Sequence, residues 1–61
     1  MNNLNKMELQ SLRHLIGSHT NLVTKLHCYA EQCNDEQAAM MFNKAADDAN
    51  ETKNKLMGFL G

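Results

Sequence analysis

The chain has 61 residues, which is enough for one domain at most. Its 6 Lys and Arg residues and 7 Asp and Glu residues leave a formal net charge of −1, so we do not expect the basic surface of a nucleic-acid-binding protein. No apolar run approaches the ~20 residues of a membrane span, and the opening stretch MNNLNKMELQ lacks the apolar centre of a signal sequence. We therefore expect a cytoplasmic protein that contacts neither nucleic acid nor membrane.

A first helix is predicted over residues 5–33. Asn5 is a good N-cap and Glu8 stands three positions later, which is the spacing of a capping box, while Leu4 and Leu9 are spaced as a hydrophobic staple. Apolar residues then recur at alternating intervals of three and four, with one histidine among them, as in the seam of a coiled coil. The members of this seam are Leu12, Leu15, His19, Leu22, Leu26, Tyr29 and Cys33.

The segment CNDEQ interrupts the pattern and predicts a turn at residues 34–35, followed by a second helix over residues 36–60. Asn34 and Asp35 both have side chains suited to an N-cap, and Asn34 with Gln37 has the spacing of a second capping box. The second helix has a seam of its own, with the same alternating intervals. Its members are Ala38, Phe42, Ala45, Ala49, Thr52, Leu56 and Phe59.

The short link between the two helices predicts an antiparallel hairpin. Ordering the chain costs on the order of 90 kcal/mol, at ~1.5 kcal/mol per residue, and two isolated helices bury too little apolar surface to offset this cost. We therefore predict an all-α domain over residues 1–61, in which two copies of the hairpin associate as a homodimer and form a ferritin-like four-helix bundle.

Three histidines and two cysteines raise the question of a metal site. At about 100° per residue, His19 lies near the middle of the apolar stripe, whereas His14 and His27 lie away from its centre. Cys28 is expected to point outward and Cys33 inward. A metal ion needs three or four ligands around one point. Because these side chains do not converge, the sequence predicts neither a metal site nor a cofactor.

Each histidine also has a simple structural interpretation. We expect His19 to be a neutral imidazole whose burial is relieved by a hydrogen bond, with Thr52 or Asp48 as the nearest partner. We expect His27 to pair with Glu31, one helical turn further along.

Catalytic patterns are missing from the sequence. No nucleophile stands beside a base, and there is no glycine-rich phosphate loop. A ferritin-like di-iron site needs a Glu-x-x-His motif, whereas the second helix carries DDANE and no histidine. We therefore expect no enzyme.

The order of three segments resembles a known family. HLIGSH (residues 14–19) leads to KLHCYAEQCNDEQAAMMF (residues 25–42) and then to AADDANETKNKLMGFL (residues 45–60). This order is similar to the repeat unit of the Coat F domain family, spore coat proteins of endospore-forming Firmicutes, although NDEQ replaces the common Asp-Pro turn. The resemblance implies a ferritin-like architecture, a single-hairpin member at half the usual length, and a structural role in the spore coat or in sporulation. It implies no ligand.

The sequence is compatible with three functions. The first is a non-catalytic structural protein that self-associates and contacts other spore coat proteins. The second is a small metal-binding bundle for copper, zinc or iron that uses His19, Cys33 and methionines across the dimer. The third is a remnant ferritin-like redox protein. The complete seams and the scattered ligand side chains favour the first.

Overall fold

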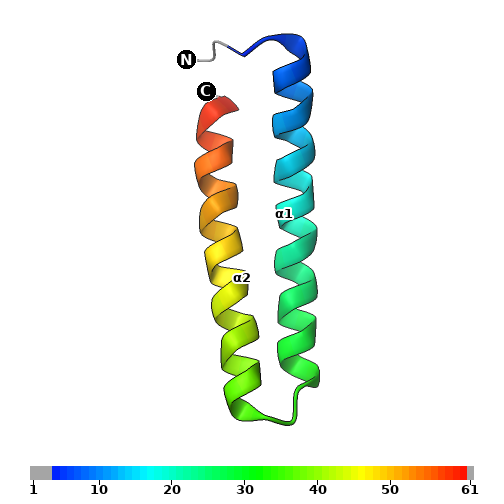
Figure 1. The fold of residues 1–61 in the computed structure, drawn as a ribbon, viewed down its shortest axis with the longest axis vertical. Coiled ribbons are helices and arrows are strands. Elements are labelled where there is room, and N and C mark those ends of the chain that lie inside the picture. Colours follow the sequence, from blue (N-terminus) through cyan, green and yellow to red (C-terminus); the bar gives the residue numbers. More distant parts are fainter. Residues whose placement is uncertain (1–3, 61) are drawn as a thin grey trace.

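The computed structural model describes residues 4–60, which form two antiparallel helices joined by a tight turn (Figure 1). Helix α1 spans Lys6–Gln32, helix α2 spans Glu36–Met57, and a short 3-10 helix, η1, follows at Gly58–Leu60. The predicted all-helical hairpin is thus confirmed for the described residues, whereas residues 1–3 and 61 of the predicted domain lie outside them. The hairpin is elongated, with Cα extents of 45 × 15 × 10 Å. We call the end with the start of α1 and η1 the open end, and the opposite end the turn end (Figure 1).

Helix α1 begins at the predicted capping box. The side-chain Oδ1 of Asn5 accepts a hydrogen bond of 2.8 Å from the Glu8 backbone N–H, and Oε1 of Glu8 accepts one of 3.1 Å from the Asn5 backbone N–H. Asn5 is the N-cap, as predicted, and Cys33, the last residue of the predicted helix, is the C-cap; both have extended backbone conformations. The capping box satisfies N–H groups that have no partner inside the helix, which is why α1 begins at this point.

Helix α2 begins with a different cap from the one predicted. The prediction that Asn34 and Gln37 form a capping box is wrong, because Asp35 is the N-cap. Its Oδ1 accepts hydrogen bonds from the backbone N–H groups of Gln37, at 2.9 Å, and Ala38, at 3.4 Å. Both side chains could cap a helix, but the carboxylate of Asp35 also interacts favourably with the positive end of the helix dipole.

The two helices pack through rows of residues spaced seven apart. On α1 the contact row is Leu9, Ile16, Val23 and Ala30, the inner row is Leu12, His19, Leu26 and Cys33, and the outer row is Leu15, Leu22 and Tyr29. On α2 the contact row is Ala39, Ala46 and Lys53, the inner row is Phe42, Ala49 and Leu56, and the outer row is Ala38, Ala45, Thr52 and Phe59.

Burial shows that α1 and α2 meet through their contact and inner rows. Every member of these rows is buried or half-buried, whereas Leu15, Leu22 and Tyr29 of the outer row are exposed. Ala46, in the contact row of α2, has no exposed surface. Each predicted seam is therefore divided, since its inner-row members face the other helix and its outer-row members lie at the side of the hairpin.

Candidate interaction surface

The outer rows of the two helices form one continuous side of the hairpin, which we call the apolar face. Its large side chains are about half exposed: Leu15 by 46%, Leu22 by 44%, Tyr29 by 48% and Phe59 by 59%. In an antiparallel pair of helices, residues at equivalent seam positions lie on the same side of the pair, so the two outer rows adjoin. The hairpin therefore presents a long apolar surface that no part of the described chain covers.

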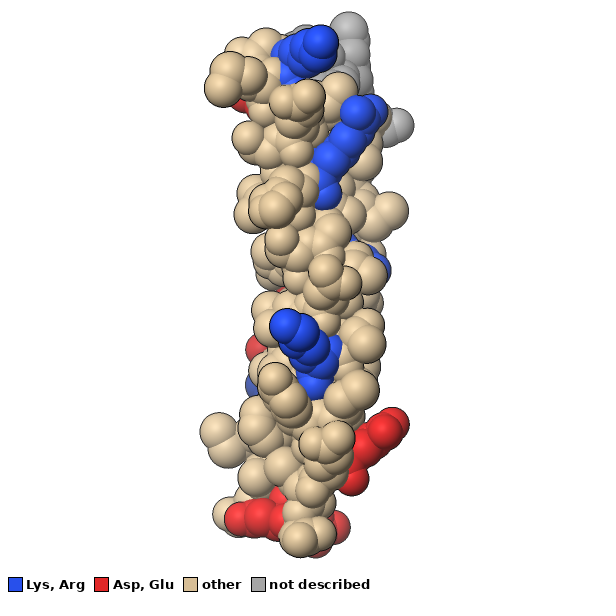
Figure 2. Space-filling view, turned by 90° about the vertical axis from the view of Figure 1, so that its right-hand side faces the viewer, with Lys and Arg blue, Asp and Glu red and all other residues tan. Residues whose placement is uncertain are grey.

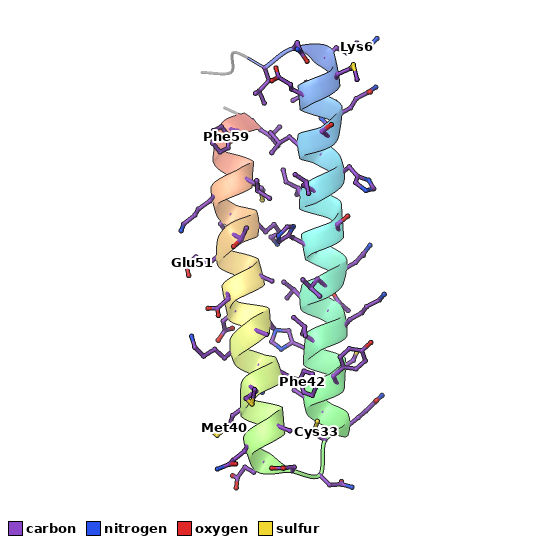
Figure 3. The ribbon with its side chains drawn as sticks, viewed as in Figure 1. Lys6, Cys33, Met40, Phe42, Glu51 and Phe59 are labelled. Carbon is purple, nitrogen blue, oxygen red and sulfur yellow. The ribbon has the colours of Figure 1, made fainter. Side chains whose placement is uncertain are left out.

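Contacts between the helices support this placement. The rings of Tyr29 and Phe42 lie 5.7 Å apart between centroids, at an interplanar angle of 59°, which is a favourable tilted arrangement. Phe42 projects toward α1, whereas Met40 and Glu51 project away from it (Figure 3). The outer-row Tyr29 therefore lies on the same side as the inner-row Phe42.

Two open hollows mark the apolar face where side chains leave space. The first, at the open end, is lined by Leu12, Leu15, Leu56 and Phe59, among others. The second lies nearer the turn and is lined by Leu26, Ala38, Met41, Phe42 and Ala45. Both hollows are shallow and almost entirely apolar, which suits side chains of another helix better than a polar small molecule.

The opposite side of the hairpin is polar. His27 Nδ1 lies 3.1 Å from Asn43 Oδ1, which joins α1 to α2 across this side. The hydroxyl of Thr20 donates to the backbone carbonyl of Ile16 at 3.0 Å, and Thr24 makes the equivalent bond to Thr20 at 3.2 Å. The expected pairing of His27 with Glu31 is replaced by the His27–Asn43 contact, because the side chain at position 27 reaches the neighbouring helix. These exposed polar groups favour contact with water on this side.

The three histidines do not converge. His14 is exposed, and the half-buried His19 is hydrogen-bonded within its own helix, with Nδ1 2.8 Å from the Leu15 carbonyl oxygen. Because a carbonyl only accepts, Nδ1 carries the proton. His19 Nδ1 therefore bonds within its own helix and not to Thr52 or Asp48, the predicted partners.

The side chains considered for a metal are also far apart within one hairpin. His19 and Cys33 are separated by fourteen positions, or about 21 Å along the helix axis. Among residues 4–60, no group of three or more His, Cys, Asp and Glu side chains is arranged to hold a metal ion. Cys28 is exposed and Cys33 half-buried, as their helical phase predicts, and both are free thiols.

Charged side chains are distributed unevenly along the hairpin. Figure 2, which looks onto α1, shows acidic side chains gathered at the turn end and basic side chains spaced along the rest of the helix. Two ion pairs, Lys44–Asp48 at 3.5 Å and Lys55–Glu51 at 3.9 Å, join neighbouring turns of α2 and are well exposed. Exposed pairs of this kind contribute about 0.3–0.5 kcal/mol each, so they support α2 without fixing the hairpin.

Comparison with known proteins gives no relative from which a function can be transferred. No protein-family model matches the chain, and neither a curated protein nor a solved structure matches it. No helix in residues 4–60 combines the length and apolar character needed to cross a membrane. The apolar face is therefore the feature of the described chain that most directly indicates a function.

Proposed function

We propose that the protein is a non-catalytic structural protein whose function is to self-associate, with two hairpins joining through their apolar faces into a homodimeric four-helix bundle. The observation that carries this proposal is the exposed outer row of each helix. A large apolar surface on one side of a small domain, opposite a polar side, is typical of an interface.

The exposed area supports the proposal quantitatively. The hairpin exposes 4890 Å², whereas a monomeric globular protein of 6.9 kDa exposes about 4,000 Å². The excess of about 900 Å² is close to the ~800 Å² per partner of a standard protein interface. The hairpin also has little interior, because Leu12, Ala30 and Ala46 are the only buried apolar residues in the described chain, and of these only Ala46 has no exposed surface.

The direction of the apolar stripe gives a second argument. Each predicted seam combines the inner and outer rows, while the contact between α1 and α2 combines the inner and contact rows. The centres of these two stripes lie about 50° apart around the helix axis. In a square four-helix bundle, the direction to the bundle centre differs by about 45° from the direction to a neighbouring helix. Each stripe thus has the direction expected of a helix with two neighbours.

A matched pair of substitutions tests the dimer. Leu22, on the apolar face, is 44% exposed, and Met40, which points away from α1, is 67% exposed. Both substitutions, Leu22→Asp and Met40→Asp, put a carboxylate in place of an exposed apolar side chain. A buried unpaired charge costs about 3–5 kcal/mol, so Leu22→Asp should weaken dimerisation by two or more orders of magnitude. Met40→Asp should leave it nearly unchanged.

Sedimentation equilibrium with circular dichroism measures both properties. The wild type and Met40→Asp are expected to be helical dimers at micromolar concentration. Leu22→Asp is expected to dissociate, with a parallel loss of helix that higher protein concentration restores. A wild type that is monomeric and fully helical under these conditions would contradict the proposal, and so would equal effects of the two substitutions.

The resemblance to Coat F domain segments adds a place of action to the proposal. A self-associating helical bundle with no catalytic pattern fits a building unit of the spore coat or another sporulation-associated layer. Imaging a fluorescent fusion through sporulation tests this part. Fluorescence that collects around the forming spore is expected, and an even distribution throughout the cell would contradict the spore-coat assignment while leaving the dimer untouched.

A further inference from the structure

We infer that the second copy docks on the apolar face in the antiparallel orientation, so that its turn end lies beside the open end of the first hairpin. This inference rests on the self-association proposed above and adds the relative orientation of the two copies. A two-fold axis parallel to the helices would bring both turn ends together. An axis perpendicular to the helices, passing near Leu22, brings each turn end to the partner's open end.

The sizes of the inner-row side chains favour the perpendicular axis. Toward the turn, Leu26 and Phe42 line one hollow and form a layer of two large side chains. The same register, seven positions further along each helix, places His19 level with the small Ala49. Rotation about an axis near Leu22 places the bulky layer of one copy level with the small layer of the other. The parallel orientation would instead place the two bulky layers level with each other and the two small layers level with each other. The first arrangement strains the packing and the second leaves a void.

The open end and the turn end of the hairpin also differ in the size of their side chains. At the open end, the large side chains of Leu12, Leu56 and Phe59 line a hollow. At the turn end, the corresponding positions hold the smaller Cys33 and Ala38. The antiparallel orientation therefore places large side chains of one copy against small side chains of the other at both ends of the bundle.

Charge favours the same orientation independently of size. The turn end carries Glu31, Asp35 and Glu36 and has no Lys or Arg between residues 31 and 37. In the parallel orientation, six carboxylates from two copies would gather at one end and repel each other. In the antiparallel orientation, each acidic end adjoins a partner end with a net positive charge. The charged residues of that open end are Lys6, Glu8, Arg13, Glu51, Lys53 and Lys55.

The two effects have different weights. Exposed charge pairs contribute at most about 1 kcal/mol each and are screened over roughly 8 Å at physiological salt. Apolar burial therefore supplies the affinity, and the charges select between two orientations that bury similar areas.

The native cysteine at the turn allows a direct distance measurement. A spin label on Cys33, in a Cys28→Ser variant that alters only an exposed position off the apolar face, reports the separation of the two turn ends. With the axis near Leu22, the two labels lie eleven positions on either side of it, which gives about 33 Å along the bundle. In the parallel orientation they would lie within about 15 Å, the width of the bundle.

A mixed dimer provides the complementary measurement. Ser11 is exposed and lies eleven positions from Leu22 on the other side from Cys33. A Ser11→Cys label in a Cys28→Ser, Cys33→Ser background is mixed with the Cys33-labelled protein. The distance between the two different labels should be short, about 15 Å or less, in the antiparallel dimer, and about 33 Å in the parallel one.

Sedimentation equilibrium of the same labelled samples separates the possible failures. Dimers with a long Cys33–Cys33 distance and a short mixed distance support the antiparallel orientation. Dimers with the two distances exchanged overturn the orientation and leave the self-association standing. Labelled and unlabelled protein that are both monomeric overturn the self-association and the orientation together.

Discussion

At the scale of single residues, the turn depends on one carboxylate. Asp35 accepts hydrogen bonds from two backbone N–H groups of the first turn of α2, whereas the neighbouring Asn34 makes no hydrogen bond that accounts for a cap. The two residues differ in charge, since Asn34 has an amide where Asp35 has a carboxylate, and in position. Asp35 combines the cap position with a charge that the helix dipole favours.

Replacing Asp35 with alanine should lower the free energy of unfolding by about 1 kcal/mol per chain, because two N–H groups lose their acceptor. Asn34→Ala, one position earlier, should change it by less than about 0.5 kcal/mol. Chemical denaturation of both variants and the wild type, at one fixed protein concentration, gives the comparison. An Asn34→Ala variant that is the less stable of the two would mean that Asn34 caps α2 in solution.

At the scale of a helix, Gly17 is the unusual residue of α1. Glycine in the interior of a helix costs about 1 kcal/mol relative to alanine, because the unfolded chain loses more conformational freedom. A Cβ atom added at Gly17 would meet nothing within 4 Å outside its own helix and chain neighbours. Within one hairpin, no close contact therefore compensates for the free-energy cost of glycine at position 17.

Gly17→Ala should raise the free energy of unfolding by up to about 1 kcal/mol per chain and leave the dimer intact, since Gly17 is exposed and lies outside the outer row. Gly58→Ala is the control, because Gly58 also has open space around its Cβ position but lies at the end of α2, where helix propensity has less weight. Thermal unfolding with sedimentation measures both properties. A Gly17→Ala variant that loses stability or dissociates would show that a partner helix passes close to Gly17.

At the scale of the whole molecule, the proposed dimer should supply much of the stability. The hairpin has three buried residues among those described, so most of its apolar side chains keep substantial contact with water. A protein with so small an interior gains much of its stability from association. Folding and dimerisation should therefore occur as one step.

The midpoint of thermal unfolding should consequently rise with protein concentration. Each tenfold increase in concentration adds about 1.4 kcal/mol to the stability of a dimer that unfolds to two chains, which corresponds to several degrees. Scans from about 5 to 500 μM, followed by circular dichroism, measure this shift. Met40→Asp should show the same dependence as the wild type, and a midpoint that stays constant over this range would indicate a self-sufficient hairpin.

The sequence alone was sufficient for most local features of this protein, with the N-cap of α2 as the exception, since Asp35 and not Asn34 is the cap. Capping-box spacing located the start of α1 at Asn5, and the alternating apolar intervals gave both helices and the directions of their stripes. The short link between them required an antiparallel hairpin. These features follow from hydrogen bonds and side-chain periodicity within a few residues, which the order of amino acids specifies directly.

The tertiary structure decided how each apolar stripe is shared. Periodicity gives the centre of a stripe but not which of its edges faces the other helix, so the sequence alone does not separate Leu15 and Leu22 from Leu12 and Leu26. Apolar periodicity does not predict that Lys53 belongs to the contact row, because lysine is polar. Its half-buried position follows only from the packing of the two helices. Which residues meet depends on the rotation of each helix about its axis, and that rotation is set by contacts between residues far apart in the chain.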